Sequence, residues 1–126
     1  MLIISLNEDQ TGTGITVERN LRALGISASC VDPPSPSAKR AFEQQLRDAK
    51  ALILITSCLD WSSLRSPVGE LATSARQLGV PTFAIVEHNE LDAFGARMLD
   101  FQLVLEVHTN EQVKAATTQI AATFHI

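Results

Sequence analysis

The segment Ala51-Leu52-Ile53-Leu54-Ile55-Thr56 is a nearly continuous apolar run in the middle of the chain. It does not alternate polar with apolar side chains. Such a run is typical of a central strand in a parallel sheet, where helices cover both faces. Parallel neighbours require crossover connections, and these are usually helices. The run therefore predicts an α/β fold built around a parallel sheet.

Outward from this run, short β-rich segments alternate with segments whose apolar residues recur every three or four positions. We expect five βα units in a single domain over residues 1–126, with strands at 2–6, 26–30, 51–56, 82–86 and 103–107. The second strand alternates apolar residues with serine, as an edge strand does. The common order 2-1-3-4-5 fits this edge position. The predicted fold is a three-layer flavodoxin-like or receiver-like sandwich around a five-stranded parallel sheet.

The helices are predicted from their apolar faces. In chain order, the residues expected to point inward are Val17, Leu21 and Leu24; Ala38, Phe42, Leu46 and Ala49; Val68, Leu71, Ala72, Ala75 and Leu78; Leu91, Phe94 and Met98; and Val113, Ala116, Ile120 and Phe124.

Residues at the helix ends support these assignments. Ser66 precedes a proline and is expected to cap the third helix, while Asn89 and Asn110 are expected to cap the fourth and fifth. Gly25 and Gly79 are expected to end the first and third helices.

Composition narrows the possible partners. Of 126 residues, 45% are apolar and 19% charged, and ten basic against fourteen acidic residues give a net charge of −4. This charge repels a phosphate backbone, so nucleic acid is not an expected partner. No apolar run approaches the ~20 residues that cross a bilayer, and no membrane partner is expected. Residues 1–6 lack the features of a signal peptide, which predicts a cytoplasmic protein.

Conventional catalytic and metal-binding residues are scarce. Cys30 and Cys58 lack the spacing of redox or zinc sites, so both are expected to be buried thiols. His88, His108 and His125 do not form a metal-spaced set. The sequence predicts no metal site and no complete set of catalytic residues.

The strand order places any ligand crevice beyond the carboxyl ends of the first and third strands, at residues 7–14 and 57–66. There, Thr11-x-Thr13-Gly14-x-Thr16 resembles the FMN-phosphate loop of flavodoxins, and Trp61 is positioned to stack on a flavin. This resemblance implies an alternative function, a small FMN-binding electron carrier. Under it the cofactor residues are Thr11, Thr13, Gly14, Thr16 and Trp61. The simpler interpretation, that the Thr-Gly pairs only form a strand-to-helix turn, is favoured.

Glu70 carries a third hypothesis. It lies early in the third predicted helix and resembles the catalytic glutamate of TIR-like and deoxyribosyltransferase-like domains. A carboxylate there can act as a nucleophile or stabilise an oxocarbenium ion while a glycosidic bond is cleaved. A first-turn glutamate also complements the helix dipole, which is the commoner role.

The whole order of segments resembles the N-terminal flavodoxin-like wing domain of bacterial PLP-dependent ornithine, lysine and arginine decarboxylases. The segments that carry the resemblance are Leu2-Ile3-Ile4, Thr13-Gly14-x-x-Val17-Glu18-Arg19-x-Leu21-x-Ala23-Leu24, Gly79-Val80-Pro81-Thr82-Phe83-Ala84-Ile85-Val86, and residues 101–116 with Leu105-Glu106 and Thr109.

The family's PLP-binding residues lie in a later catalytic domain outside these segments. The resemblance therefore implies a non-catalytic assembly or regulatory domain, excised from or N-terminal to a larger decarboxylase. It implies no cofactor in this chain and PLP in the parent enzyme. The implied partners are the rest of that enzyme and further copies of this domain.

Overall fold

The computed structural model describes residues 1–7 and 11–124. Within these residues, five strands alternate with five α-helices and two short 3-10 helices. In chain order the elements are β1 (Leu2–Ser5), α1 (Thr11–Ala23), β2 (Ser29–Val31), η2 (Pro36–Ala38), α2 (Lys39–Ala49), β3 (Leu52–Leu59), η3 (Trp61–Arg65), α3 (Pro67–Gln77), β4 (Thr82–Asn89), α4 (Ala93–Leu99), β5 (Leu103–Glu106) and α5 (Asn110–Phe124).

The strands form one parallel sheet in the order β2-β1-β3-β4-β5. This confirms the predicted flavodoxin-like α/β fold and its strand order. The apolar run that suggested the fold forms most of β3, whose first five residues are buried between β1 and β4. β3 and β4 stay paired as far as Leu59 and Asn89, so these two strands extend beyond their neighbours at the carboxyl edge.

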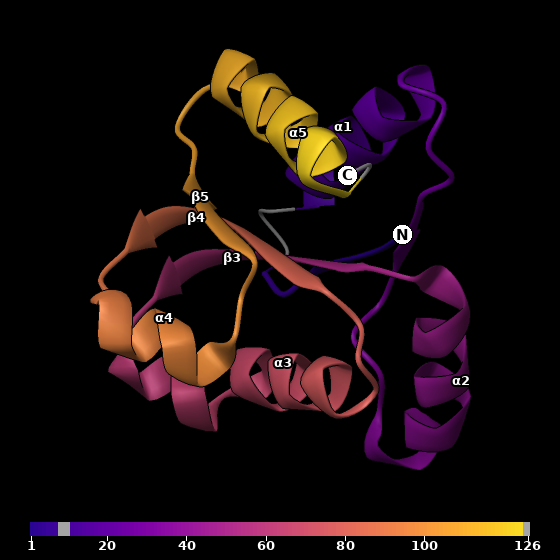
Figure 1. The fold of residues 1–126 in the computed structure, drawn as a ribbon, viewed down its shortest axis with the longest axis vertical. Coiled ribbons are helices and arrows are strands. Elements are labelled where there is room, and N and C mark those ends of the chain that lie inside the picture. The colour runs from indigo at the N-terminus through magenta and orange to yellow at the C-terminus, as the bar shows by residue number, and fades with distance from the viewer. Residues whose placement is uncertain (8–10, 125–126) are drawn as a thin grey trace.

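Helices cover both faces of the sheet (Figure 1). α1 and α5 lie side by side on one face, where Val17, Leu21 and Ile120 pack against inward-facing strand residues. α2, α3 and α4 cover the other face and share a second apolar core with it. No helix in the described part of the chain is both long and apolar enough to cross a membrane.

The second strand begins later than expected. It runs over Ser29–Val31 instead of residues 26–30, because the backbone N–H of Ile26 donates to the Leu21 carbonyl and holds residue 26 against the end of α1. Ile26 and Ala28 are buried in the core that α1 and α5 cover. The position of β2 at the sheet edge is as predicted.

The helix ends follow the predictions only in part. Gly25 and Gly79 adopt φ values of 81° and 71°, which a glycine accommodates without a steric penalty, and each follows the helix it was expected to end. Ser66 occupies the residue before α3, but its hydroxyl donates to the Ser63 carbonyl and does not cap the helix.

The two predicted asparagine caps are wrong. Asn89 is the last residue of β4, and the Asp92 side chain instead accepts from the Gly95 N–H at the start of α4. At α5 the Thr109 side chain accepts from the Gln112 N–H while the Gln112 side chain accepts from the Thr109 N–H. This reciprocal pair is a capping box one residue before the predicted cap.

Three residues predicted to point inward point outward instead. The exposed fractions are 63% for Phe94, 48% for Met98 and 50% for Leu24. In α4 the inward side belongs to Gly95 and Leu99, which are both buried. A Cβ on Gly95 would approach Leu91 Cδ2 to 2.8 Å, so α4 packs here through a residue without a side chain. Phe94 and Met98 lie on another side of the helix because of this packing.

Candidate functional site

The carboxyl ends of β1 and β3 meet at a small crevice, where the strand order predicted a ligand site. The Asn7 side chain joins the two strands: its Oδ1 accepts from Thr56 Oγ1 at 3.2 Å and from the Ser57 N–H at 3.0 Å. A cavity of about 260 Å³ opens there, with Asn7, Cys58 and Asp60 in its lining. The structure thus brings together residue 7 and the segment 57–66.

Asp60 organises the loop that leaves β3. Its side chain accepts from the backbone N–H and the hydroxyl of Ser62, and its own N–H donates to Ser63 Oγ at 3.0 Å. The hydrogen bonds from Ser62 lower the pKa of Asp60, against a smaller opposing effect of burial. This capping box starts η3 and fixes the direction in which Trp61 leaves the sheet.

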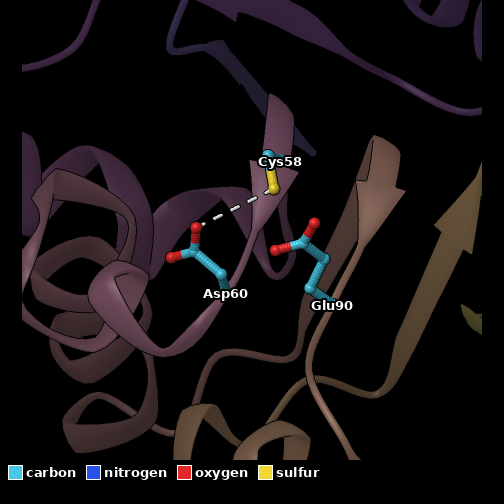
Figure 2. A group of neighbouring side chains, drawn as sticks. All are labelled: Cys58, Asp60 and Glu90. Carbon is cyan, nitrogen blue, oxygen red and sulfur yellow. Dashed lines mark hydrogen bonds between the residues drawn. The ribbon is translucent and has the colours of Figure 1, made fainter.

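Cys58, Asp60 and Glu90 converge beside this loop (Figure 2). One donor atom from each, the thiol sulfur and two carboxylate oxygens, lies within 4.8 Å of the other two. Cys58 Sγ donates to Asp60 Oδ2 across 3.9 Å. Burial raises the pKa of Cys58, and the carboxylates of Glu90 and Asp60 raise it further because they disfavour a thiolate.

The prediction of a buried Cys58 is wrong, since the residue is only half-buried. It lies on the part of β3 that extends beyond β1, where the sheet offers less cover. Sequence reasoning missed the three-residue cluster because Glu90 is distant in sequence. The signal that could have found it is the parallel register, which places Leu59 opposite Asn89.

Cys30 is also not buried, contrary to prediction. It lies on the edge strand β2, which leaves the residue exposed. Its thiol donates to the Gly14 carbonyl at 3.3 Å. Partial desolvation of the sulfur, together with the nearby Glu18 carboxylate, raises the pKa of Cys30 to about 12. A thiol with so high a pKa is a poor nucleophile at neutral pH.

The residues of the FMN hypothesis fall in two places. Thr13, Gly14 and Thr16 lie inside the first turns of α1, and the side chain of Thr11 lies outside the described residues. Gly14 is buried, and a Cβ there would approach Ser5 Oγ to 2.5 Å, so this glycine allows α1 to pack closely on β1. The Thr16 hydroxyl donates to the Gly12 carbonyl. These contacts favour the strand-to-helix packing role, and FMN binding stays a prediction.

Trp61, the remaining residue of that hypothesis, belongs to a different surface. Its ring lies 6.1 Å from that of Phe94, centroid to centroid, with 35° between the planes. Trp61 is 48% exposed, and Met98 lies one helical turn after Phe94. We call Trp61, Phe94 and Met98 the apolar patch. It joins η3 to α4, two elements in direct contact.

Glu70 is exposed in the first turn of α3. It lines a groove of about 650 Å³ between α3 and the start of α2, together with Pro36, Lys39, Phe42 and Ser74. Apolar and hydrogen-bonding groups therefore surround a carboxylate in a groove large enough for a small molecule.

No family model matches the chain, and no curated protein matches it. Solved structures do match. The TIR domains of the RPS4 and RRS1 heterodimer give a TM-score of 0.76 at 11% identity, covering 100% of this chain and 99% of the other. An archaeal flavodoxin gives 0.62 at 10% identity, covering 99% and 98%. The 2-deoxyribosyltransferase of Bacillus psychrosaccharolyticus gives 0.53 at 16% identity, covering 93% and 96%. The chain is similar to these proteins in fold, and the archaeal flavodoxin agrees with the predicted flavodoxin-like architecture.

Proposed function

We propose that this chain is a non-catalytic assembly domain that associates with a second copy of itself through the apolar patch. The single observation that carries the proposal is the exposure of Trp61, Phe94 and Met98 side by side on η3 and α4. Contiguous exposed apolar side chains on a folded domain mark sites of association. Aromatic residues and methionine are also enriched in the centres of protein interfaces.

Charges of both signs lie on or next to the elements that carry the patch. Arg65 and Arg97 lie on η3 and α4, while Asp92 lies just before α4. In the described part of the chain, the ion pairs are Arg22–Glu18 and His108–Glu106, so neither arginine beside the patch is paired. A two-fold contact brings the same surface of both copies together, and a surface with both signs can then pair with itself. This charge arrangement supports a second copy as the occupant.

The proposal is tested by sedimentation velocity over a wide range of protein concentrations. The wild-type chain should show a mass that rises from monomer toward dimer. Phe94→Ser should stay monomeric over the same range, since it removes the most exposed aromatic ring of the patch. Leu24→Ser is the matched control, because Leu24 is also an exposed apolar residue but directly follows α1, outside the patch. A wild-type chain that is monomeric at every concentration contradicts self-association.

The parent enzyme is part of the same proposal. The resemblance of the sequence to the wing domain supports a PLP-dependent ornithine, lysine or arginine decarboxylase, in which this domain helps to assemble or regulate the oligomer. The coding sequence tests this directly. A PLP-lysine segment in the same reading frame after residue 126 supports the assignment. A reading frame without one contradicts the decarboxylase parent but leaves the sedimentation test valid.

Glu70 supports a second candidate function, the cleavage of a glycosidic bond in a nucleoside or dinucleotide. The observation that favours it is the position of this carboxylate in the groove between α2 and α3. The flavodoxin-like fold is compatible with such chemistry, as the similarity to a 2-deoxyribosyltransferase indicates. Incubation with NAD or nucleosides should release free base with the wild-type chain and not with Glu70→Gln. Equal release from both chains contradicts this function.

A further inference from the structure

The donor atoms of Cys58, Asp60 and Glu90 are held in position by the backbone of the two longest strands. Cys58 and Asp60 lie at the end of β3 and directly after it, and Glu90 directly follows β4. The Glu90 N–H donates to the Leu59 carbonyl at 2.7 Å and continues the pairing of β3 with β4 beyond the last strand residues. The three side chains thus come from one corner of the sheet (Figure 2).

The charge of this corner is uncompensated. Asp60 and Glu90 are both carboxylates, and neither belongs to an ion pair in residues 1–7 and 11–124. Hydrogen bonds from Ser62 stabilise the Asp60 carboxylate, and the negative charge of the two neighbouring carboxylates attracts a cation. The adjoining cavity of about 260 Å³ is lined by Cys58 and Asp60, while Glu90 lies outside its lining. It leaves space for water beside a cation held by the three donor atoms.

We propose that Cys58, Asp60 and Glu90 bind a divalent cation of the zinc class. A thiolate with two carboxylates is a mixed sulfur and oxygen donor set that suits Zn²⁺, whereas Mg²⁺ and Ca²⁺ take oxygen donors only. Three protein ligands leave a fourth position for water. When the metal–sulfur bond forms, the Cys58 thiol releases its proton to the buffer. The hydrogen bond from this thiol to Asp60 Oδ2 is then lost, and the carboxylate oxygen is free to bind the metal.

The experiment uses Co²⁺ as a spectroscopic probe with the whole chain, kept reduced by a reductant that contains no thiol. Titration of the wild-type chain should produce a thiolate-to-cobalt charge-transfer band, and Zn²⁺ should remove the band by displacing the probe. Cys58→Ser should abolish the band because the band requires a metal–sulfur bond. Glu90→Gln should weaken binding by roughly tenfold or more, since it removes one charged ligand.

Two controls separate this site from other side chains. Cys30→Ser should keep the band unchanged, because Cys30 lies on the edge strand β2. Glu111→Gln should keep the wild-type affinity, because Glu111 is an exposed carboxylate in the first turn of α5. Circular dichroism confirms that each variant folds. A wild-type chain without a charge-transfer band, or a band that persists in folded Cys58→Ser, overturns the proposal.

Discussion

Helices α3 and α4 have the same kind of apolar sequence pattern but lie in different environments. Both lie on the same face of the sheet, and both have apolar residues at helical spacing. α3 buries its apolar residues Val68, Leu71, Ala72 and Ala75. α4 buries Leu99 and Gly95 but exposes Phe94 and Met98.

The difference teaches what helical periodicity can and cannot indicate. An apolar stripe predicts a helix face that avoids water, but it does not say whether the sheet or another molecule covers that face. α4 has only seven residues and packs through a glycine, so the sheet covers one narrow side of it. The remaining apolar residues are the ones for which we propose a second copy as the partner.

The largest expected effect compares the two helices directly. Leu71→Ala in α3 leaves a cavity in a buried core and should lower the free energy of unfolding by about 2–5 kcal/mol. Met98→Ala in α4 should change it by less than about 0.5 kcal/mol in the monomer, since the side chain is half-exposed. Urea denaturation at low protein concentration measures both. Equal losses would contradict the assignment of these two faces.

A similar contrast, between a closely packed glycine and one without close neighbours, can be tested within α1. Gly14→Ala places a methyl group 2.5 Å from Ser5 Oγ and should destabilise the chain by about 1–3 kcal/mol. Gly12→Ala is the matched control, because no atom of the described residues lies within 4 Å of its Cβ position, and it should be neutral or slightly stabilising. Urea midpoints that rank the two variants in the opposite order would refute the packing role of Gly14.

The comparison can also be tested through the pH dependence of stability. Asp60 caps η3, and Trp61 of η3 packs against Phe94 of α4. Its folded pKa is lowered, so its contribution to stability is complete above the ordinary value of 3.8 and disappears as the pH falls through the folded pKa. Asp60→Ala should therefore unfold at a lower temperature than wild type at neutral pH. The gap between the two should shrink in acid. If the difference in unfolding temperature stays constant from neutral pH into acid, the charge of Asp60 does not stabilise η3.

The smallest expected effect is the response to FMN. Because Gly14 packs on β1 and Trp61 packs on Phe94, we expect no quenching of flavin fluorescence when the chain is mixed with micromolar FMN. Quenching that Trp61→Leu removes would restore the electron-carrier alternative and would assign Trp61 to a cofactor site.

Much of the fold could be predicted from the sequence because it depends on burial. The continuous apolar run of β3, the alternation before β2, and the glycines after α1 and α3 each report a local environment that the chain must satisfy. The residues at which the helices start were harder to predict. Asp92, three residues after Asn89, and Thr109, one residue before Asn110, cap these helices instead.

The candidate site was harder to predict, since its members come from different strands. Cys58 and Glu90 meet only because β3 and β4 pair in register beyond the rest of the sheet, and no spacing within the sequence encodes that. Trp61 was predicted as a flavin contact from its place after the third strand. Its contact with Phe94 depends on how the capping box of Asp60 turns the chain.

Trp61 offers the most direct test of the central claim, because it is the only tryptophan in the sequence and lies within the apolar patch. We predict that its emission shifts to shorter wavelength as the protein concentration rises, since a second copy removes the ring from water. Phe94→Ser should abolish this shift, and Leu24→Ser should preserve it. Emission that is independent of concentration in the wild-type chain, over a range that reaches tens of micromolar and above, would contradict assembly through this patch.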